Sequence, residues 1–386
     1  MTAEDLRNWR LIDQFAKILD GRLPPLAGTW RDPKRQLGQG QYLCFFLFAL
    51  FNPVVQTVRG ICAASKLEKV QRHLRSQSVS LGSFSEAQHL CNPTLLAGIF
   101  EDMSRQVPAP TLKDPRQQWE QWLAQDSSVF SALPRMKWAV YGGGCSVEGK
   151  PNRAVRLHLS FNVISDHPAS VRVKPANVCE RKVWKEQWEP GAAYVGDRYY
   201  GEDYGLFDLL HRADCRYILR LRDKTLMDVQ EELPLSEADS VAGVVRQALV
   251  QLGTGRRQRP VRVVWVDTPK AGQLILVTNL DAQDAPADLV AQIYRRRWQV
   301  EGFFRWVKCL LGCGHWLAES QRGVTIQLYL ALIGALLMHL HLGRRPNKRM
   351  FELLQFHLLG WAELDELIEG LEREKARLKK EKNKRD

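Results

Sequence analysis

Four polar side chains recur at fixed spacing in the stretch YRRRWQVEGFFRWVK. They are Tyr294, Arg297, Glu301 and Lys308. Apolar residues repeat there at helical intervals, which predicts one helix over 294–308. At about 100° per residue, the four side chains share an arc of roughly 60°. A carboxylate flanked by fixed cations suits metal-assisted phosphate chemistry, although an ordinary amphipathic helix with an i,i+4 ion pair shows the same stripe.

A second carboxylate of interest is Asp197, in the segment YVGDRYYG. The apolar run Ala192–Val195 is typical of a strand, and Gly196 ends it directly before the aspartate. A carboxylate at this point lies where a strand edge meets a loop. Taken alone, such a residue is an ordinary turn aspartate.

The pattern Y-x2-R-x3-E-x6-K resembles the signature around the last catalytic acid of the insertion-sequence family 4 transposases, which use a DDE triad. Two further segments, SLGSFSEAQHLCNPTLL and DRYYG, resemble segments of the same family, and the resemblance covers roughly residues 80–345. It implies a ribonuclease-H-like core in which Asp197 and Glu301 are catalytic acids and bind Mg²⁺ in a two-metal site.

The resemblance also implies a first acid at the end of the first strand, before a glycine. In the strand WAVYGGG, that position is occupied by Tyr141. A phenol with a reference pKa near 10 is a poor substitute for a carboxylate that bridges two metal ions. The sequence therefore predicts an impaired metal site.

The roles implied by the resemblance extend to DNA. Arg297 would clamp a phosphate, while Tyr294 and Lys308 would hold the cleaved DNA end. The expected activity is phosphodiester hydrolysis and transesterification at the terminal inverted repeats of the element and at target DNA. The resemblance further implies a homodimer in a synaptic complex that acts in the cytoplasm at the nucleoid.

The expected fold class is α/β: a ribonuclease-H-like mixed sheet with a β-rich insertion, an all-helical region before it and helices after it. The expected parts are a helical, DNA-binding N-terminal region (1–130), the transposase core (131–345) and a charged helical tail (346–386). The insertion is expected at about 222–280. Strands are predicted at 136–142, 156–164, 170–175, 192–197, 216–222, 260–267 and 273–280.

Charge and cysteine usage agree with a protein that acts on DNA inside the cell. The formal charge of +12 and the pI near 9.4 favour a polyanionic partner such as nucleic acid. The eight cysteines are scattered rather than paired densely, which favours a reducing compartment. Within Cys309-x3-Cys313-x-His315 no fourth ligand is near, so incidental thiols are favoured over zinc.

Two function classes remain open besides the enzyme. Because Tyr141 interrupts the triad, the chain would alternatively be a catalytically defective or retained transposase-derived DNA-binding protein. Residues 323–343 and 37–58 carry no formal charge and are long enough to span a bilayer, which leaves a membrane-associated protein as a third class. Polar interruptions within both stretches favour buried core helices.

Overall fold

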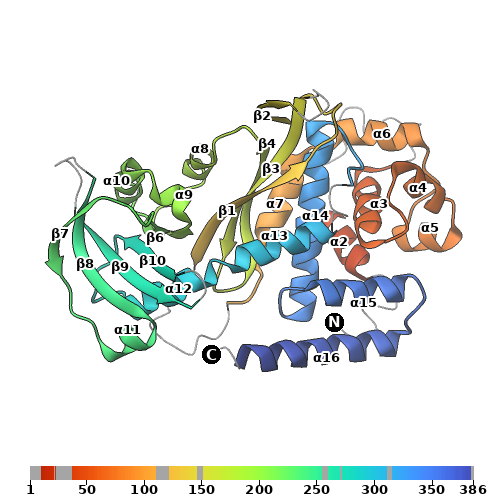
Figure 1. The fold of residues 1–386 in the computed structure, drawn as a ribbon. Helices are drawn as coiled ribbons and strands as arrows, with labels where there is room; N and C mark the ends of the chain where they lie inside the picture. Colours follow the sequence, from red (N-terminus) through yellow and green to blue (C-terminus); the bar gives the residue numbers. More distant parts are fainter. Residues whose placement is uncertain are drawn as a thin grey trace. The chain divides into compact units, whose positions relative to one another are not determined.

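The structure is a computed structural model (Figure 1). It describes residues 10–20, 22, 37–109, 121–145, 151–253, 260–269, 272–310 and 315–383. The chain divides into two compact units. Unit 1 comprises residues 1–107, 130–155 and 305–386, and unit 2 comprises residues 108–129 and 156–304.

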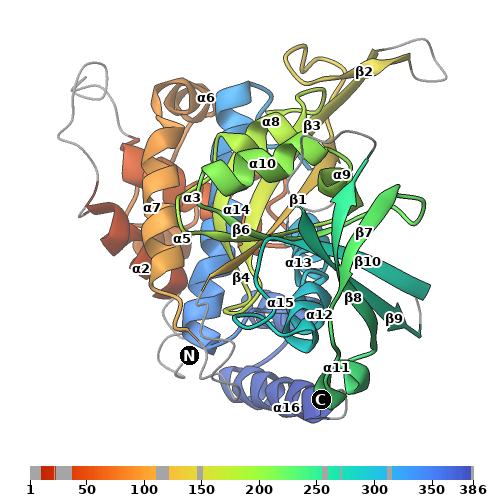
Figure 2. The same cartoon turned by 90° about the vertical axis from the view of Figure 1, so that its left-hand side faces the viewer.

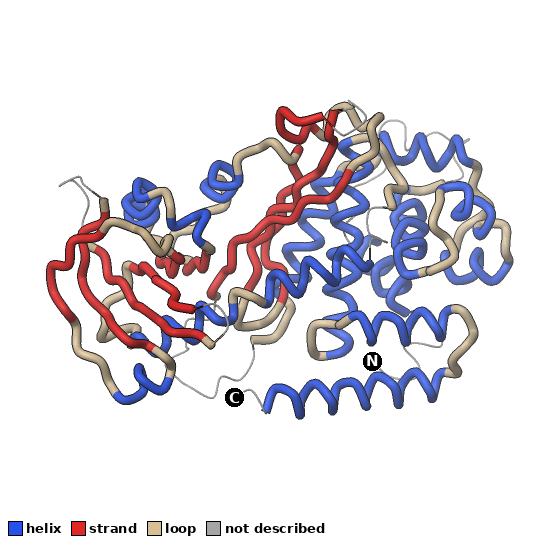
Figure 3. Tube along the Cα trace, viewed as in Figure 1, coloured by secondary structure: helices blue, strands red, loops and turns tan. Residues whose placement is uncertain are grey.

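Unit 1 is built mainly from helices, as the tube trace shows (Figure 3). Those before the sheet are α2 (Arg10–Asp20), α3 (Gln39–Phe51), α4 (Val58–Ala64), α5 (Glu68–Leu74), α6 (Leu81–Leu90) and α7 (Pro93–Arg105). Those after it are α14 (Gln321–Leu342), α15 (Lys348–Leu358) and α16 (Leu364–Asn383). Side-chain caps fix several helix starts: Ser80, Asn92 and Ser320 each accept a bond from a backbone N–H of the first turn.

Helix α14 forms the centre of unit 1 and contacts α2, α3, α6 and α7. Its 22 residues are apolar and long enough to cross a membrane, yet 89% of its most apolar window is buried inside the protein. At Gly334 an added Cβ would lie 3.0 Å from the Phe51 ring, so the glycine permits close approach of α3. Burial among helices therefore accounts for the uncharged stretch.

A single sheet supplies the framework of unit 2. Its strands are β1 (Trp122–Ser131), β3 (Pro151–Asn162), β4 (His167–Pro175), β5 (Ala193–Gly196), β6 (Arg216–Arg220), β7 (Met227–Glu232), β8 (Val244–Leu252), β9 (Val261–Thr268) and β10 (Gly272–Thr278). The order is β2-β3-β1-β5-β6-β10-β9-β8-β7, and β4 pairs with β3 off this path. The strand β2 (Val140–Cys145) belongs to unit 1, as do the adjoining ends of β1 and β3.

The sheet has a parallel part and an antiparallel part. Strands β1, β5 and β6 run parallel to one another, whereas β10, β9, β8 and β7 continue from β6 as antiparallel neighbours. The parallel centre confirms the expected ribonuclease-H-like α/β class. The antiparallel strands fall in the stretch, about 222–280, where an insertion was expected.

Helices cover both faces of the unit 2 sheet (Figure 2). They are α8 (Glu180–Lys185), α9 (Arg198–Gly201), α10 (Tyr204–Arg212), α11 (Glu237–Val241), α12 (Ala287–Arg296) and α13 (Gln299–Leu310), the last turns of which belong to unit 1. Trp184 of α8 and Phe207 of α10 pack with Tyr194 and Tyr217 in one core cluster. Helix α12 contacts α11, β8 and β9.

Two sequence predictions about elements are wrong. The region before Phe130 is not all helical, because β1 runs from Trp122 to Ser131 and crosses the boundary expected between residues 130 and 131. The expected strand at 136–142 begins only at Val140. β1 begins with four buried residues, Trp122 to Gln125, and a short buried run without alternation does not distinguish a strand from a helix.

The predicted helix over 294–308 is also interrupted. Helix α12 ends at Arg296 and α13 begins at Gln299. At the break, the Arg297 N–H bonds to the Tyr294 carbonyl, and the Val300 N–H bonds to the Arg297 carbonyl. Arg297 is 6% exposed at this break, and Trp298 beside it is 60% exposed. The stretch therefore forms two helices rather than one.

Candidate functional site

Two aspartates come from neighbouring strands of the parallel sheet. In the register of β1 and β5, Trp122 pairs with Ala193 and Ala124 pairs with Val195. Asp126 lies two residues beyond the last of these pairs in β1, and Asp197 lies two residues beyond it in the other strand. Because the two strands run parallel in this register, the two carboxylates lie in one region of unit 2, where the charge of Asp197 acts on Asp126.

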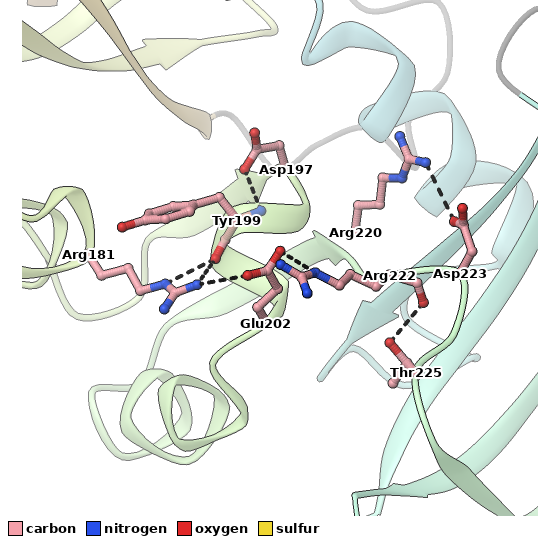
Figure 4. Close-up of polar contacts among 8 residues, drawn as sticks. All are labelled: Arg181, Asp197, Tyr199, Glu202, Arg220, Arg222, Asp223 and Thr225. Carbon is pink, nitrogen blue, oxygen red and sulfur yellow. Dashed lines mark hydrogen bonds and ion pairs between the residues drawn. The ribbon is translucent and has the colours of Figure 1, made fainter. Parts of the chain in front are cut away.

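Asp197 also fixes the start of the next helix. Its Oδ1 accepts a hydrogen bond of 2.9 Å from the Tyr199 N–H and so caps α9 (Figure 4). The chain can turn back closely there because residue 201 is glycine. A Cβ on Gly201 would overlap the carbonyl oxygen of Arg220 in β6. Local capping and this close packing together set the position of Asp197.

Arg297 contacts both Glu301 and Asp126. Its Nη2 donates to Glu301 Oε1 at 2.8 Å, and its Nη1 lies 3.9 Å from Asp126 Oδ2. The Arg297 side chain is 7% exposed, whereas those of Asp126 and Glu301 are 23% and 34% exposed. The guanidinium thus lies on the buried side of two carboxylates that remain open to solvent.

The three carboxylates influence one another electrostatically. Burial raises the pKa of Asp126 to about 6, and the charges of Asp197 and Glu301 add to this, while Arg297 and the Ser127 N–H oppose it. Burial would lower the pKa of Arg297, but Tyr294, Glu301 and Asp126 outweigh that effect and raise it. Unit 2 therefore concentrates negative charge around one buried cation.

The other residues expected at the site are placed differently. Tyr294 is 4% exposed and its ring centroid lies 5.9 Å from Arg297 Cζ, so it belongs to the core beneath the acids. Burial raises its pKa. Lys308 is half-buried in unit 1, where its Nζ lies 5.4 Å from the centroid of the Phe130 ring. Trp298 is exposed at the helix break rather than packed.

Tyr141 does not lie in the strand that pairs in parallel with β5. It lies in β2, which pairs with β3 in unit 1, and it is 41% exposed. The strand that pairs in parallel with β5 is β1, and β1 carries Asp126. The sequence interpretation did not consider Asp126, because it assigned helix to the region in which β1 forms.

The donor chemistry of the acids fits a hard divalent cation. Among the described residues, no three metal-ligating side chains stand close enough to form a finished metal site. Arg297 instead supplies the positive charge between Glu301 and Asp126. Three carboxylates that are partly open and mutually repulsive are the oxygen ligands that Mg²⁺ prefers. Asp126, Asp197 and Glu301 therefore offer the type of ligand that such an ion takes.

A known protein family matches the part of the chain that carries these acids. The family described as "Transposase DDE domain" matches residues 120–337, a range that starts just before β1 and ends in α14. The chain belongs to this transposase family. The matched range includes Asp126 in β1, Asp197 after β5 and Glu301 in α13.

Individual relatives carry transposase names. The chain is 28% identical over 210 residues to y4zB of Sinorhizobium fredii (strain NBRC 101917 / NGR234), covering 53% of this chain and 57% of that protein. It is 27% identical over 219 residues to the protein of insertion sequence element IS5377 of Geobacillus stearothermophilus, covering 56% and 55%. This transposase chain therefore spans little more than half the length of these two relatives.

A longer match is to the protein of insertion sequence element IS4SA of Synechocystis sp. (strain ATCC 27184 / PCC 6803 / Kazusa). It is 30% identical over 276 residues and covers 69% of this chain and 73% of that protein. Among solved structures, a piggyBac transposase synaptic complex with hairpin DNA aligns with a TM-score of 0.40 at 10% identity, over 92% of this chain and 79% of that one.

The site residue missed by sequence reasoning is Asp126. A signal was present, because WLAQD repeats the arrangement of AYVGD: a short apolar run followed within two residues by an aspartate. In this transposase, both runs are buried strands and both aspartates follow them at the same edge. Comparing the two runs would have identified the pair.

Proposed function

We propose that this chain is the transposase of a bacterial insertion sequence, which binds the ends of its element and carries out metal-dependent DNA cleavage and strand transfer. The observation that supports this most directly is the pairing of β1 with β5, because it brings Asp126 beside Asp197. Membership of the transposase family supports the same reaction class.

In this proposal the carboxylates of Asp126, Asp197 and Glu301 hold Mg²⁺. The bound ions supply activation of a water or DNA 3′-hydroxyl and stabilise the leaving oxygen. Arg297 orients Glu301 and Asp126 from the buried side, so that their outer oxygens face the substrate. Because a proton and Mg²⁺ compete for the Asp126 carboxylate, its raised pKa predicts that Mg²⁺ binding strengthens as the pH rises through about 6.

DNA contacts are proposed for Tyr294, Arg297 and Lys308. Lys308 is the most direct candidate because it is only half-buried. Arg297 would contact a phosphate with the N–H groups that its bond to Glu301 leaves over, and Tyr294 lies beside its guanidinium. Two copies would act together in a synaptic complex, on element ends and target DNA in the cytoplasm.

The alternative of a DNA-binding protein without cleavage rested on Tyr141. Because β1 carries the carboxylate of Asp126, Tyr141 is no longer an argument against catalysis. Catalysis is therefore the function proposed.

The test is a Mg²⁺-dependent nicking assay on DNA that carries the terminal repeats of the element. Asp126→Asn, Asp197→Asn and Glu301→Gln should each lower the nicking rate by at least about a thousandfold, as loss of a group that acts in the transition state does. The matched control is Asp228→Asn, which changes an exposed carboxylate in β7. Nicking by Asp126→Asn at the unsubstituted rate would refute the assignment.

A further inference from the structure

An exposed tyrosine stands directly beside the second acid. Tyr199 lies in the first turn of α9 and keeps 37% of its surface exposed, although its N–H is bonded to Asp197 Oδ1. The ring and the carboxylate are therefore carried by the same tight turn. Whatever holds Asp197 in place also fixes the backbone from which this ring projects.

Arg181 backs the ring from a different helix. Its Cζ lies 4.3 Å from the Tyr199 ring centroid, which is a cation–π contact. The same guanidinium donates from Nε to the Tyr199 carbonyl at 3.0 Å, and its Nη2 lies 3.7 Å from Glu202 Oε2 (Figure 4). Glu202 in turn accepts a bond of 2.5 Å from Arg222 Nε. A chain of charged contacts thus holds Arg181 against the aromatic ring.

Two further side chains contact Tyr199. The buried Tyr200 ring packs with it in a T-shaped arrangement, with centroids 5.5 Å apart and an interplanar angle of 81°. The Cys179 Sγ lies 3.9 Å from the Tyr199 hydroxyl. Burial raises the pKa of Tyr199, so the phenol stays neutral at physiological pH and does not repel an anionic ligand. A ring that is already fixed loses little conformational freedom when a ligand stacks on it.

The charges around this ring favour a polyanion. Arg198 follows Asp197 directly and is exposed, and Arg181 and Arg222 lie within the contacts described above. A flat aromatic surface surrounded by guanidinium groups suits a nucleotide, because bases of every type stack on aromatic rings while cations attract the phosphates. Glu202 is already paired with two of these arginines.

We propose that Tyr199, backed by Arg181, is a stacking platform for one unpaired nucleobase of the DNA held at the acidic site. This inference rests on the proposed function, since it assumes that DNA lies against Asp197. The unpaired base comes either from the element end or from single-stranded target DNA. The platform adds affinity for unpaired DNA, and it contributes little to fully paired DNA.

The experiment measures binding and fluorescence quenching of DNA that contains 2-aminopurine, in Mg²⁺-free buffer. The probes are an element-end duplex with 2-aminopurine in an unpaired overhang, a single strand of target sequence with 2-aminopurine, and a fully paired element-end duplex. The wild-type chain should quench the unpaired probe. Tyr199→Leu should lose the quenching and bind unpaired DNA about tenfold more weakly, within the range of one base–aromatic stack.

Three further variants sharpen the test. Tyr199→Phe should keep both the quenching and the affinity, because stacking needs the ring and not the hydroxyl. Arg181→Gln should weaken binding of the unpaired probe less than Tyr199→Leu does. Tyr141→Leu is the matched control, because Tyr141 is a similarly exposed tyrosine, at 41%, in unit 1. Equal thermal unfolding of the variants shows that the fold is retained.

Each outcome decides a separate point. Quenching of the overhang probe identifies the element end as the source of the base, and quenching of the single strand alone identifies the target. If the wild-type chain binds the paired duplex and Tyr199→Leu binds every probe as tightly as wild type, the platform is refuted while the proposed function stands. If the wild-type chain binds none of the probes, the proposed function fails and the platform fails with it.

Discussion

Asp126, within β1, and Asp197, directly after β5, lie at matching register in two neighbouring parallel strands, each two residues beyond the pair Ala124–Val195. Their proximity is a consequence of strand pairing rather than of sequence spacing. The same relationship explains why the charge of Asp197 contributes to the raised pKa of Asp126. A site of this kind depends on the order of strands in the sheet, so substitutions far from the acids can disturb it.

The first prediction concerns Tyr141. This residue lies in β2 of unit 1 and not in the strand beside β5. Tyr141→Asp should therefore behave as a surface substitution away from the site and leave the Mg²⁺-dependent nicking rate within about twofold of the unsubstituted rate. The measurement is the initial rate on terminal-repeat DNA.

A large gain of activity in Tyr141→Asp would instead show that this position does supply the missing acid. The double variant Tyr141→Asp/Asp126→Asn distinguishes these two interpretations further. It should be as inactive as Asp126→Asn alone, because the new aspartate lies in a different strand.

Much of the fold was predictable because local patterns carry it. Strands β3, β4, β5, β6, β9 and β10 overlap the strands predicted from apolar runs. Strands β7 and β8 were not predicted, and β7 is polar and exposed along almost its whole length. The uncharged stretch 323–343 became α14, since its polar residues were too few to oppose burial. The helix break at Arg297 was not predictable from periodicity, because apolar residues recur at helical spacing on both sides of it. Of the two carboxylates beside Arg297, Glu301 is a local i,i+4 partner and Asp126 comes from β1.

Two of the three acids could be predicted because they lie in segments with a local sequence pattern. Asp197 and Glu301 lie in segments with a recognisable local signature. Asp126 lies in a strand whose identity depends on its partner, because WLAQDSSVFS has no strict alternation and four of its residues are half-buried. Pairing with β5 and β3 distinguishes this strand from the helices before it.

The second prediction is a pH dependence of stability centred on His158 in β3. Burial lowers the pKa of this histidine to about 4, and Arg156 and Lys174 lower it further. The unfolded chain takes up a proton below about pH 6.5, but the folded chain does not until about pH 4. The contribution of His158 is therefore fully present above pH 6.5 and is lost progressively as the pH falls toward 4.

Urea unfolding at pH 7 and pH 5 measures this effect. His158→Gln should reduce the loss of unfolding free energy between the two pH values by about 2 kcal/mol relative to the unsubstituted chain. His89→Gln, at an exposed position of α6, is the control and should leave the pH dependence unchanged. An identical pH dependence in His158→Gln would show that His158 is not held neutral in the folded protein.

The third prediction concerns the glycine that allows α9 to approach β6. A Cβ on Gly201 would overlap the Arg220 carbonyl oxygen and lie 2.8 Å from its carbonyl carbon. Because the obstacle is backbone, Gly201→Ala should cost about 2 to 3 kcal/mol of unfolding free energy. It should also slow nicking, since α9 is capped by Asp197.

Gly205→Ala is the matched control in the neighbouring helix α10. Its Cβ would lie 3.4 Å from the Asp203 side chain, which can move, and an alanine there should change stability by less than about 1 kcal/mol, in the stabilising direction. Equal stability of the two alanine variants in urea unfolding would show that the α9–β6 contact is looser than described.

The fourth prediction tests Lys308 as a phosphate contact. Lys308 lies on α13 seven residues after Glu301, is half-buried, and has its Nζ 5.4 Å from the Phe130 ring, so its reach is restricted. Lys308→Gln should weaken binding of terminal-repeat DNA roughly threefold to tenfold at low salt and reduce the slope of log affinity against log salt by about one.

Lys348→Gln is the control, because Lys348 is 69% exposed on α15 and pairs with Glu352. Since a lost phosphate contact must change the salt slope, a Lys308→Gln chain with weakened binding and an unchanged slope would assign Lys308 to packing against Phe130 instead.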